Sequence, residues 1–110
     1  MSDDITQLTI EDISEGSGQE CPADATVKVH YTGTLMDGTK FDSSHDRGEP
    51  ATFPLEKLIP GIRDGIAGMK VGGERKITVP HTQGYGDEGV PPVIPPRADL
   101  VFEVELLDIH

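Results

Sequence analysis

The chain has 110 residues, a length that suits one domain with one hydrophobic core. Its formal net charge of −11 argues against a nucleic-acid-binding surface, because phosphate binding needs clustered lysines and arginines. Cys21 is the single cysteine, so neither an intramolecular disulfide nor a cysteine-based zinc site can form. We interpret Cys21 as a passive free thiol. The acidic excess is a solvated surface that favours solubility, and it would also favour basic clients.

Targeting signals are not evident. No run of residues approaches the roughly 18 to 20 apolar positions needed to span a bilayer, so we expect no membrane association. The first ten residues, MSDDITQLTI, are acidic and lack the basic and apolar regions of a signal peptide. We therefore expect a cytoplasmic protein, or a mature form that has already been trimmed. Its charge, and the lack of an obvious apolar surface patch, predict a monomer. Residues 1–110 would form a single domain, with 1–5 as a loose N-terminal leader.

Alternation of apolar and polar residues predicts half-buried strands. The clearest case is the series Leu100, Phe102, Val104 and Leu106. The dipeptide Asp37-Gly38 is typical of a hairpin turn. Four segments are predicted as strands on this pattern: 6–13, 27–32, 75–79 and 100–106.

One segment has helical periodicity, and its apolar residues recur at steps of three and four. Pro60 suits the first turn of this helix, where a missing amide hydrogen costs nothing. The amide of Ile59, just before the helix, would lie outside the intrahelical ladder and be free to donate to a ligand. The predicted class is α+β, an antiparallel sheet wrapped around one short helix. The residues that would share the helix face are Leu58, Ile59, Ile62, Ile66 and Met69.

A long connection rich in glycine and proline, residues 81–98, lies between the last two predicted strands. Long loops in small domains are usually functional or disordered. The prolines restrict the backbone and the glycines permit turns, so the segment is predicted to be a shaped flap over a shallow apolar pocket. The alternative is a long surface connection that binds no ligand. Its apolar and aromatic contact groups are Tyr85, Val90, Val93 and Ile94.

Four blocks in order, VHYTGTLMDGTKFDSS, FPLEKLIPGI, GYGDEGVPPVIPP and LVFEVELLDI, resemble the FKBP-type peptidyl-prolyl cis/trans isomerases. The similarity covers about residues 10–109 and is closest to minimal, bacterial-like members. It implies a curved five- or six-stranded antiparallel half-barrel around one short α-helix. It also implies an apolar pocket for a proline ring, proline-containing peptides and unfolded or nascent chains as clients, and binding of the macrolides tacrolimus and rapamycin. No cofactor is implied.

The resemblance also assigns site residues. It implies that Asp42 accepts hydrogen bonds near the substrate, that the Ile59 amide binds a substrate carbonyl, and that the Tyr85 hydroxyl binds the substrate. Arg47 would be a supporting basic partner for the aspartate. Taken singly, Phe41, Ile94 and Phe102 have an alternative role as plain core, and Asp42 as a turn residue. The implied catalytic residues are Tyr31, Asp42, Ile59 and Tyr85, and the implied substrate-binding residues are Phe41, Leu58, Ile62, Val93, Ile94 and Phe102.

The chain departs from the family pattern at three positions. The pocket floor, commonly tryptophan, is Ile62. An aromatic at the outer edge is replaced by Ala51, and Val90 stands where a polar residue or histidine is frequent. An isoleucine floor keeps an apolar surface but loses the aromatic contact, which is worth about 0.5 to 1.5 kcal/mol beyond its area. We therefore expect reduced macrolide affinity.

Other chemistries find little support. The histidines at positions 30, 45, 81 and 110 lack metal-ligand spacing, so no metal site is expected. The sequence pairs no base with Ser43 or Ser44, and it nominates no second carboxylate for hydrolytic chemistry with Asp42. Two function classes remain: a prolyl isomerase that assists protein folding, and a binding module or weak folding helper of the same fold with little isomerase activity.

Overall fold

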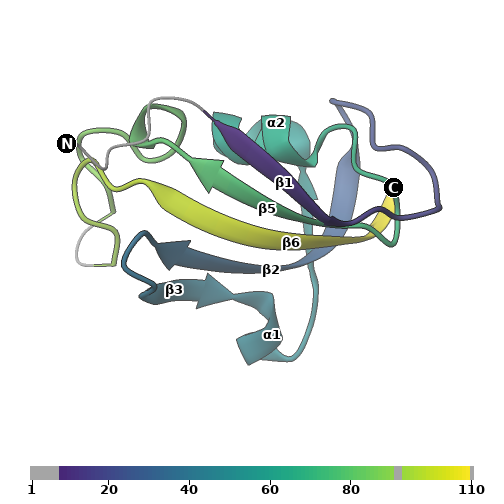
Figure 1. The fold of residues 1–110 in the computed structure, drawn as a ribbon, viewed down its shortest axis with the longest axis horizontal. Helices are drawn as coiled ribbons and strands as arrows, with labels where there is room; N and C mark the ends of the chain where they lie inside the picture. The colour runs from purple at the N-terminus through teal and green to yellow at the C-terminus, as the bar shows by residue number, and fades with distance from the viewer. Residues whose placement is uncertain (1–7, 91–92, 110) are drawn as a thin grey trace.

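The computed structural model describes residues 8–90 and 93–109. In this part of the chain, a six-stranded antiparallel sheet curves around helix α2 (Figure 1). The sheet order is β1-β5-β6-β2-β3, and β4 also pairs with β2. The predicted α+β class is confirmed. The strands are β1 Thr9–Ser14, β2 Thr26–Leu35, β3 Lys40–Ser43, β4 Ala51–Pro54, β5 Glu74–Val79 and β6 Leu100–Ile109, and the helices are α1 Ser44–Arg47 and α2 Pro60–Ile66.

The alternating pattern correctly identified the central strands. β2 and β6 pair along most of their lengths, and β5 pairs with the other side of β6. Their inward residues form the core against α2, because each strand buries every second side chain. These buried residues are Val27, Val29, Ile77, Val79, Leu100, Phe102, Val104 and Leu106.

The first strand, β1, lies at an edge of the sheet and pairs with β5 alone. All its side chains are exposed, so it adds little to the core. It was predicted over 6–13, and the structure places it at Thr9–Ser14. Positions 6–7 and the predicted leader 1–5 lie outside the described residues.

Helix α2 begins at Pro60 as predicted, but it is shorter than the apolar periodicity indicated. Ile62 and Ile66 lie within it and are buried, while Met69 follows it in a turn. Leu58 and Ile59 precede it, because Ile59 is extended (φ −59°, ψ 147°) and a 3₁₀ turn, η1 (Leu55–Lys57), comes before. The apolar spacing therefore indicated which residues pack against the core, but these residues lie in a turn, a helix and a second turn and not in one helix.

Two glycines let α2 lie close to the sheet. A Cβ atom on Gly61 would stand 2.5 Å from Val79 Cγ1, and one on Gly65 would stand 2.6 Å from Ile77 Cδ1. Such distances are not tolerated between carbon atoms. The glycines that weaken this helix in isolation are therefore the ones that allow it to pack on β5.

The prediction of a single helix was incomplete. A second, four-residue helix, α1, follows β3 directly and is capped at its C-terminal end by Gly48, whose φ is +76°. One turn is too short to show a helical period, so the sequence offered no signal for it. The helix carries Arg47, which matters for the site described below.

The Asp37-Gly38 turn joins β2 to β3 as predicted. Gly38 has φ +92°, the Leu35 amide donates to the Thr39 carbonyl at 2.8 Å, and Asp37 Oδ1 accepts from the Thr39 amide at 2.9 Å. A side-chain carboxylate and a left-handed glycine together close this hairpin. The turn thereby sets where β3 begins.

The flap, residues 81–98, begins with a 3₁₀ turn, η2 (His81–Gln83), and is tied by its own backbone. The Gly86 amide donates to the His81 carbonyl, and the Arg97 amide donates to the Gly86 carbonyl. Asp99 anchors its base, because Asp99 Oδ1 accepts from the His81 amide at 2.9 Å. The described part of the flap is thus shaped by hydrogen bonds; residues 91–92 lie outside the described chain.

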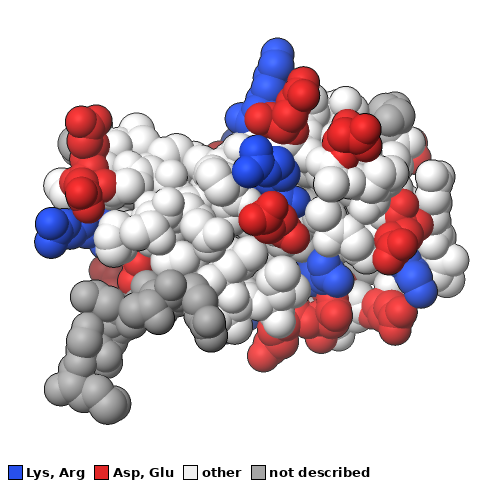
Figure 2. All heavy atoms as spheres, turned by 90° about the horizontal axis from the view of Figure 1, so that it is seen from above, with Lys and Arg blue, Asp and Glu red and all other residues white. Residues whose placement is uncertain are grey.

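Surface charge is dispersed. On the face seen in Figure 2, acidic and basic side chains are scattered, and the basic groups do not join into one patch.

Within residues 8–90 and 93–109, no helix combines the length and the apolar character that crossing a membrane requires.

Candidate active site

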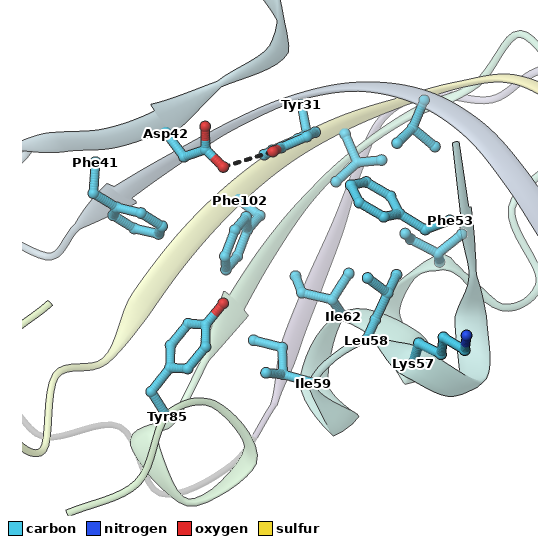
Figure 3. Close-up of a pocket in the computed structure, with 13 residues that line it drawn as sticks. Tyr31, Phe41, Asp42, Phe53, Lys57, Leu58, Ile59, Ile62, Tyr85 and Phe102 are labelled. Atoms are coloured by element: carbon cyan, nitrogen blue, oxygen red, sulfur yellow. Dashed lines mark hydrogen bonds between the residues drawn. The ribbon is translucent and has the colours of Figure 1, made fainter. Parts of the chain in front are cut away.

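A cavity of about 310 Å³ opens between the concave face of the sheet, the η1–α2 segment and the flap (Figure 3). Its walls come from strands β2, β3, β4 and β6 and from Tyr85 of the flap. The pocket predicted from the flap is therefore present. The predicted site residues that line it are Tyr31, Phe41, Asp42, Leu58, Ile59, Ile62, Tyr85 and Phe102.

Two predicted residues do not line the pocket. Val93 is 51% exposed and Ile94 is 4% exposed within the core. The amides and carbonyls of Val90 and Ile94 exchange two hydrogen bonds of 2.8 Å, which hold the backbone of Ile94 against that of Val90. With this pairing, Ile94 lies inside the protein and Val93 at its surface. The structure thus places neither residue among those that line the cavity, and it buries Ile94 in the core, the alternative role considered for it.

Several lining residues were not assigned to the site from sequence. Phe53 lies opposite Val27 across the β2–β4 pair, so both side chains share the concave face, and its ring centroid lies 6.0 Å from that of Tyr31. Strand β4 is too short for its alternation to be recognised. The lining residues missed by sequence analysis are Val29, Phe53, Lys57, Ile66 and Val104.

Two aromatic rings form the apolar wall beside the flap. Phe41 and Phe102 meet edge to face, with centroids 5.6 Å apart and an interplanar angle of 86°. Gly33 makes room for them, since a Cβ atom there would lie 2.6 Å from Phe41 Cζ and 2.9 Å from Phe102 Cε1. This geometry is a favourable arrangement of aromatic quadrupoles.

The polar wall is a closed network of three side chains. The Tyr31 hydroxyl donates to Asp42 Oδ2 at 2.6 Å (Figure 3). Arg47 donates from Nη1 to Asp42 Oδ1 at 2.6 Å and from Nη2 to the Tyr31 oxygen at 3.0 Å. The guanidinium carbon also lies 5.6 Å from the centre of the Tyr31 ring. Asp42 is therefore more than a turn residue, and Arg47 is its partner.

The network sets the protonation states of its members. Burial favours a higher pKa for Asp42, but the hydrogen bonds from Tyr31 and Arg47 and the charge of Arg47 outweigh it, so the pKa lies below its ordinary value. Burial, followed by the hydrogen bond to Asp42, raises the pKa of Tyr31. Burial, with the charge of Asp42, raises the pKa of Tyr85. At neutral pH the pocket therefore presents one carboxylate and two protonated hydroxyls.

The start of α1 is anchored by a buried hydroxyl. Ser44 Oγ accepts from the Tyr31 amide at 2.8 Å and lies 2.8 Å from His30 Nδ1. The sequence paired no base with Ser44, and the structure corrects this by placing His30 beside it. The side chain is fully buried and its hydroxyl is held by the backbone of β2. Ser44 thus fixes the position of α1 and does not offer an accessible nucleophile.

Two further donors are available to a ligand. The Ile59 carbonyl accepts from the amides of Ile62 and Arg63, whereas the Ile59 amide has no acceptor among the described residues. The Tyr85 hydroxyl likewise has no hydrogen-bond partner in the described chain, and Figure 3 shows it pointing into the pocket. An apolar cavity with a few unpaired donors is suited to a peptide segment whose carbonyls need partners.

Comparison with known proteins agrees with this geometry. The family model for FKBP-type peptidyl-prolyl cis-trans isomerase matches residues 18–107. The chain is 51% identical over 105 residues to the FK506-binding protein of Neisseria meningitidis serogroup B. This match covers 94% of this chain and 96% of the relative. It is 56% identical over 86 residues to the peptidyl-prolyl cis-trans isomerase FPR2 of Saccharomyces cerevisiae, covering 76% and 64% of the two chains.

Among solved structures, FkpA from Escherichia coli superposes with a TM-score of 0.89 at 45% identity. The match covers 94% of this chain and 48% of that chain, so the similarity concerns one part of FkpA. Sequence, fold and pocket therefore agree: the chain belongs to the FKBP-type peptidyl-prolyl cis-trans isomerases.

Proposed function

We propose that this isomerase accelerates rotation about X–Pro bonds by binding the twisted amide in the pocket under the flap, without forming a covalent bond. The observation that carries the proposal is an apolar cavity with two donors that have no partner among the described residues, the Ile59 amide and the Tyr85 hydroxyl. The clients are proline-containing peptides and unfolded or nascent chains.

The reaction asks little of side-chain chemistry. The barrier of about 18 to 20 kcal/mol comes from amide resonance, and uncatalysed rotation takes tens of seconds or longer. Twisting removes the resonance, so the carbonyl becomes less polar and the nitrogen gains a lone pair. An apolar site disfavours the polar planar amide relative to the twisted one. Each roughly 1.36 kcal/mol of this preference gives about tenfold in rate.

Each polar group has a distinct role in this mechanism. The Ile59 amide and the Tyr85 hydroxyl hold the client chain on either side of the proline. Asp42, kept ionised by Arg47, places a fixed negative charge beside the reacting amide, and the Tyr31 hydroxyl orients that carboxylate. Leu58, with the aromatic rings of the wall, encloses the proline ring. Preorganised dipoles of this kind do not have to reorient when the amide twists.

The test is NMR exchange spectroscopy on a Leu-Pro peptide, with catalytic amounts of protein. We expect faster cis/trans exchange with the natural chain and slower turnover with Asp42→Ala or Tyr85→Phe, while circular dichroism shows that both variants remain folded. A folded variant with full activity would remove its residue from the mechanism. The matched control is Lys40→Ala, since Lys40 pairs with the exposed Asp46 of α1 and does not line the cavity.

The alternative is a binding module that holds proline-containing clients with little catalysis. Ile62 favours it, because an isoleucine floor offers less contact to the proline than an aromatic ring. Saturable binding of the Leu-Pro peptide without faster exchange would support this alternative. Reduced affinity for macrolides such as tacrolimus and rapamycin follows from the same residue.

The monomeric state and the cytoplasmic location also remain predictions. Light scattering after size-exclusion chromatography tests the monomeric state.

A further inference from the structure

We propose that Lys57 is a specificity-determining residue that favours clients with an acidic residue beside the proline. The inference rests on the proposed mode of client binding. Lys57 is the one basic residue among the described residues that line the pocket. In Figure 3 it lies across the pocket from Tyr85.

The backbone beneath Lys57 is firmly held. Lys57 ends the 3₁₀ turn η1, two residues after Leu55, which is completely buried. The Leu55 amide donates to the Ala25 carbonyl at 3.0 Å, and the Leu58 amide donates to the Leu55 carbonyl at 3.0 Å. The backbone that carries the Lys57 side chain is therefore held in place beside the pocket.

The charge of Lys57 is available to a client. No carboxylate in the described chain lies within 4 Å of its ammonium, including that of the adjacent Glu56. The other charged lining residue, Asp42, is already paired with Arg47. A client carboxylate entering the pocket thus meets one acid that is already ion-paired and, within the described residues, one lysine that is not.

The position of Lys57 also indicates on which side of the proline it meets the client. The mechanism holds the client by the Ile59 amide on one side of the proline and by Tyr85 on the other. Lys57 precedes Ile59 by two residues and lies away from Tyr85. Its ammonium therefore meets the client residue on the Ile59 side. The net charge of −11 disfavours acidic peptides in general. A cation at the pocket should therefore produce a preference that can be measured by comparing matched peptides.

The experiment compares kcat/KM for matched peptides that differ by one charge: Glu-Pro against Gln-Pro, and Pro-Glu against Pro-Gln. We expect the acid-to-amide ratio at one of these positions to fall about two- to fivefold in Lys57→Met, the range expected for an exposed ion pair. It should fall further in Lys57→Glu and be restored by Lys57→Arg. Raising the salt concentration should reduce the natural chain's ratio toward that of Lys57→Met.

The matched control is Lys28→Met, which removes the same charge from β2 outside the pocket lining and should leave every ratio unchanged. Ratios at both positions that do not change in Lys57→Met would overturn the proposal. Dissociation constants of the same peptides, measured by NMR titration, keep this test separate from catalysis. If the natural chain binds the peptides but accelerates none of them, the proposed mechanism fails, and the ratio of dissociation constants still decides the role of Lys57.

Discussion

Tyr31 and Asp42 come from neighbouring strands, and the hydroxyl of the first donates to the carboxylate of the second at 2.6 Å. Arg47, from the one-turn helix that follows β3, binds both of them. The orientation of the pocket's carboxylate therefore depends on three backbone segments. Changes in any of them should alter catalysis before they alter the fold.

The two bonds from Arg47 should matter more than its charge. A lysine in its place would keep the positive charge but lose the planar fork that reaches Asp42 and Tyr31 together. We expect Arg47→Ala to reduce kcat/KM about two- to tenfold and Arg47→Lys to restore a small part of the loss. NMR exchange on the Leu-Pro peptide measures this. Full activity in Arg47→Lys would show that charge alone is sufficient.

Asp42 should contribute to stability in a pH-dependent way. Its folded-state pKa lies below the ordinary value of 3.8, so the ionised form is favoured by folding. The contribution is complete above the unfolded-state pKa and is lost as pH falls through the folded-state pKa. The stability difference between the natural chain and Asp42→Asn should therefore be constant above about pH 5 and shrink below about pH 4. Urea unfolding across this range checks it; a difference that grows toward low pH would contradict the assigned direction.

The pocket floor should control macrolide affinity. Ile62→Trp would restore an aromatic contact worth about 0.5 to 1.5 kcal/mol, or roughly two- to twelvefold in affinity. The natural chain has no tryptophan, so the introduced indole is also a selective fluorescent reporter. Isothermal titration with rapamycin measures the change, and thermal unfolding detects overpacking. Unchanged affinity in a stable variant would mean that the floor residue does not limit binding.

The contact between α2 and β5 should not accept a methyl group. Gly65→Ala improves helix propensity by about 1 kcal/mol, but its Cβ would collide with Ile77, and overpacking typically costs about 1 to 3 kcal/mol. We expect net destabilisation in urea unfolding. Asp64→Ala, at the neighbouring exposed position of the same helix, is the control and should be nearly neutral or stabilising. A stabilised Gly65→Ala would show that the helix can move away from the sheet.

The elements that sequence analysis identified are those that bury one face over many residues. β2 and β6 are ten residues long, so their alternation was visible, and Pro60 marked the start of α2. β4 and α1 have four residues each, too few to show a period. They were therefore missed, and with them the place of Phe53 in the pocket and the helical position of Arg47.

By itself, the sequence determined the long central strands of the sheet, the start of α2, the family and most of the pocket residues, because burial repeats with a fixed period and the four blocks are specific. Only the tertiary structure decided which apolar residues border a cavity and which are plain core. Ile94 fills the core and Val93 faces solvent, although they are neighbours in one motif. The reason is physical: periodicity reports that a side chain is removed from water, whereas a cavity depends on what other segments leave unfilled. The unpaired cation of Lys57 became visible in the same way, through distances to acids elsewhere in the chain.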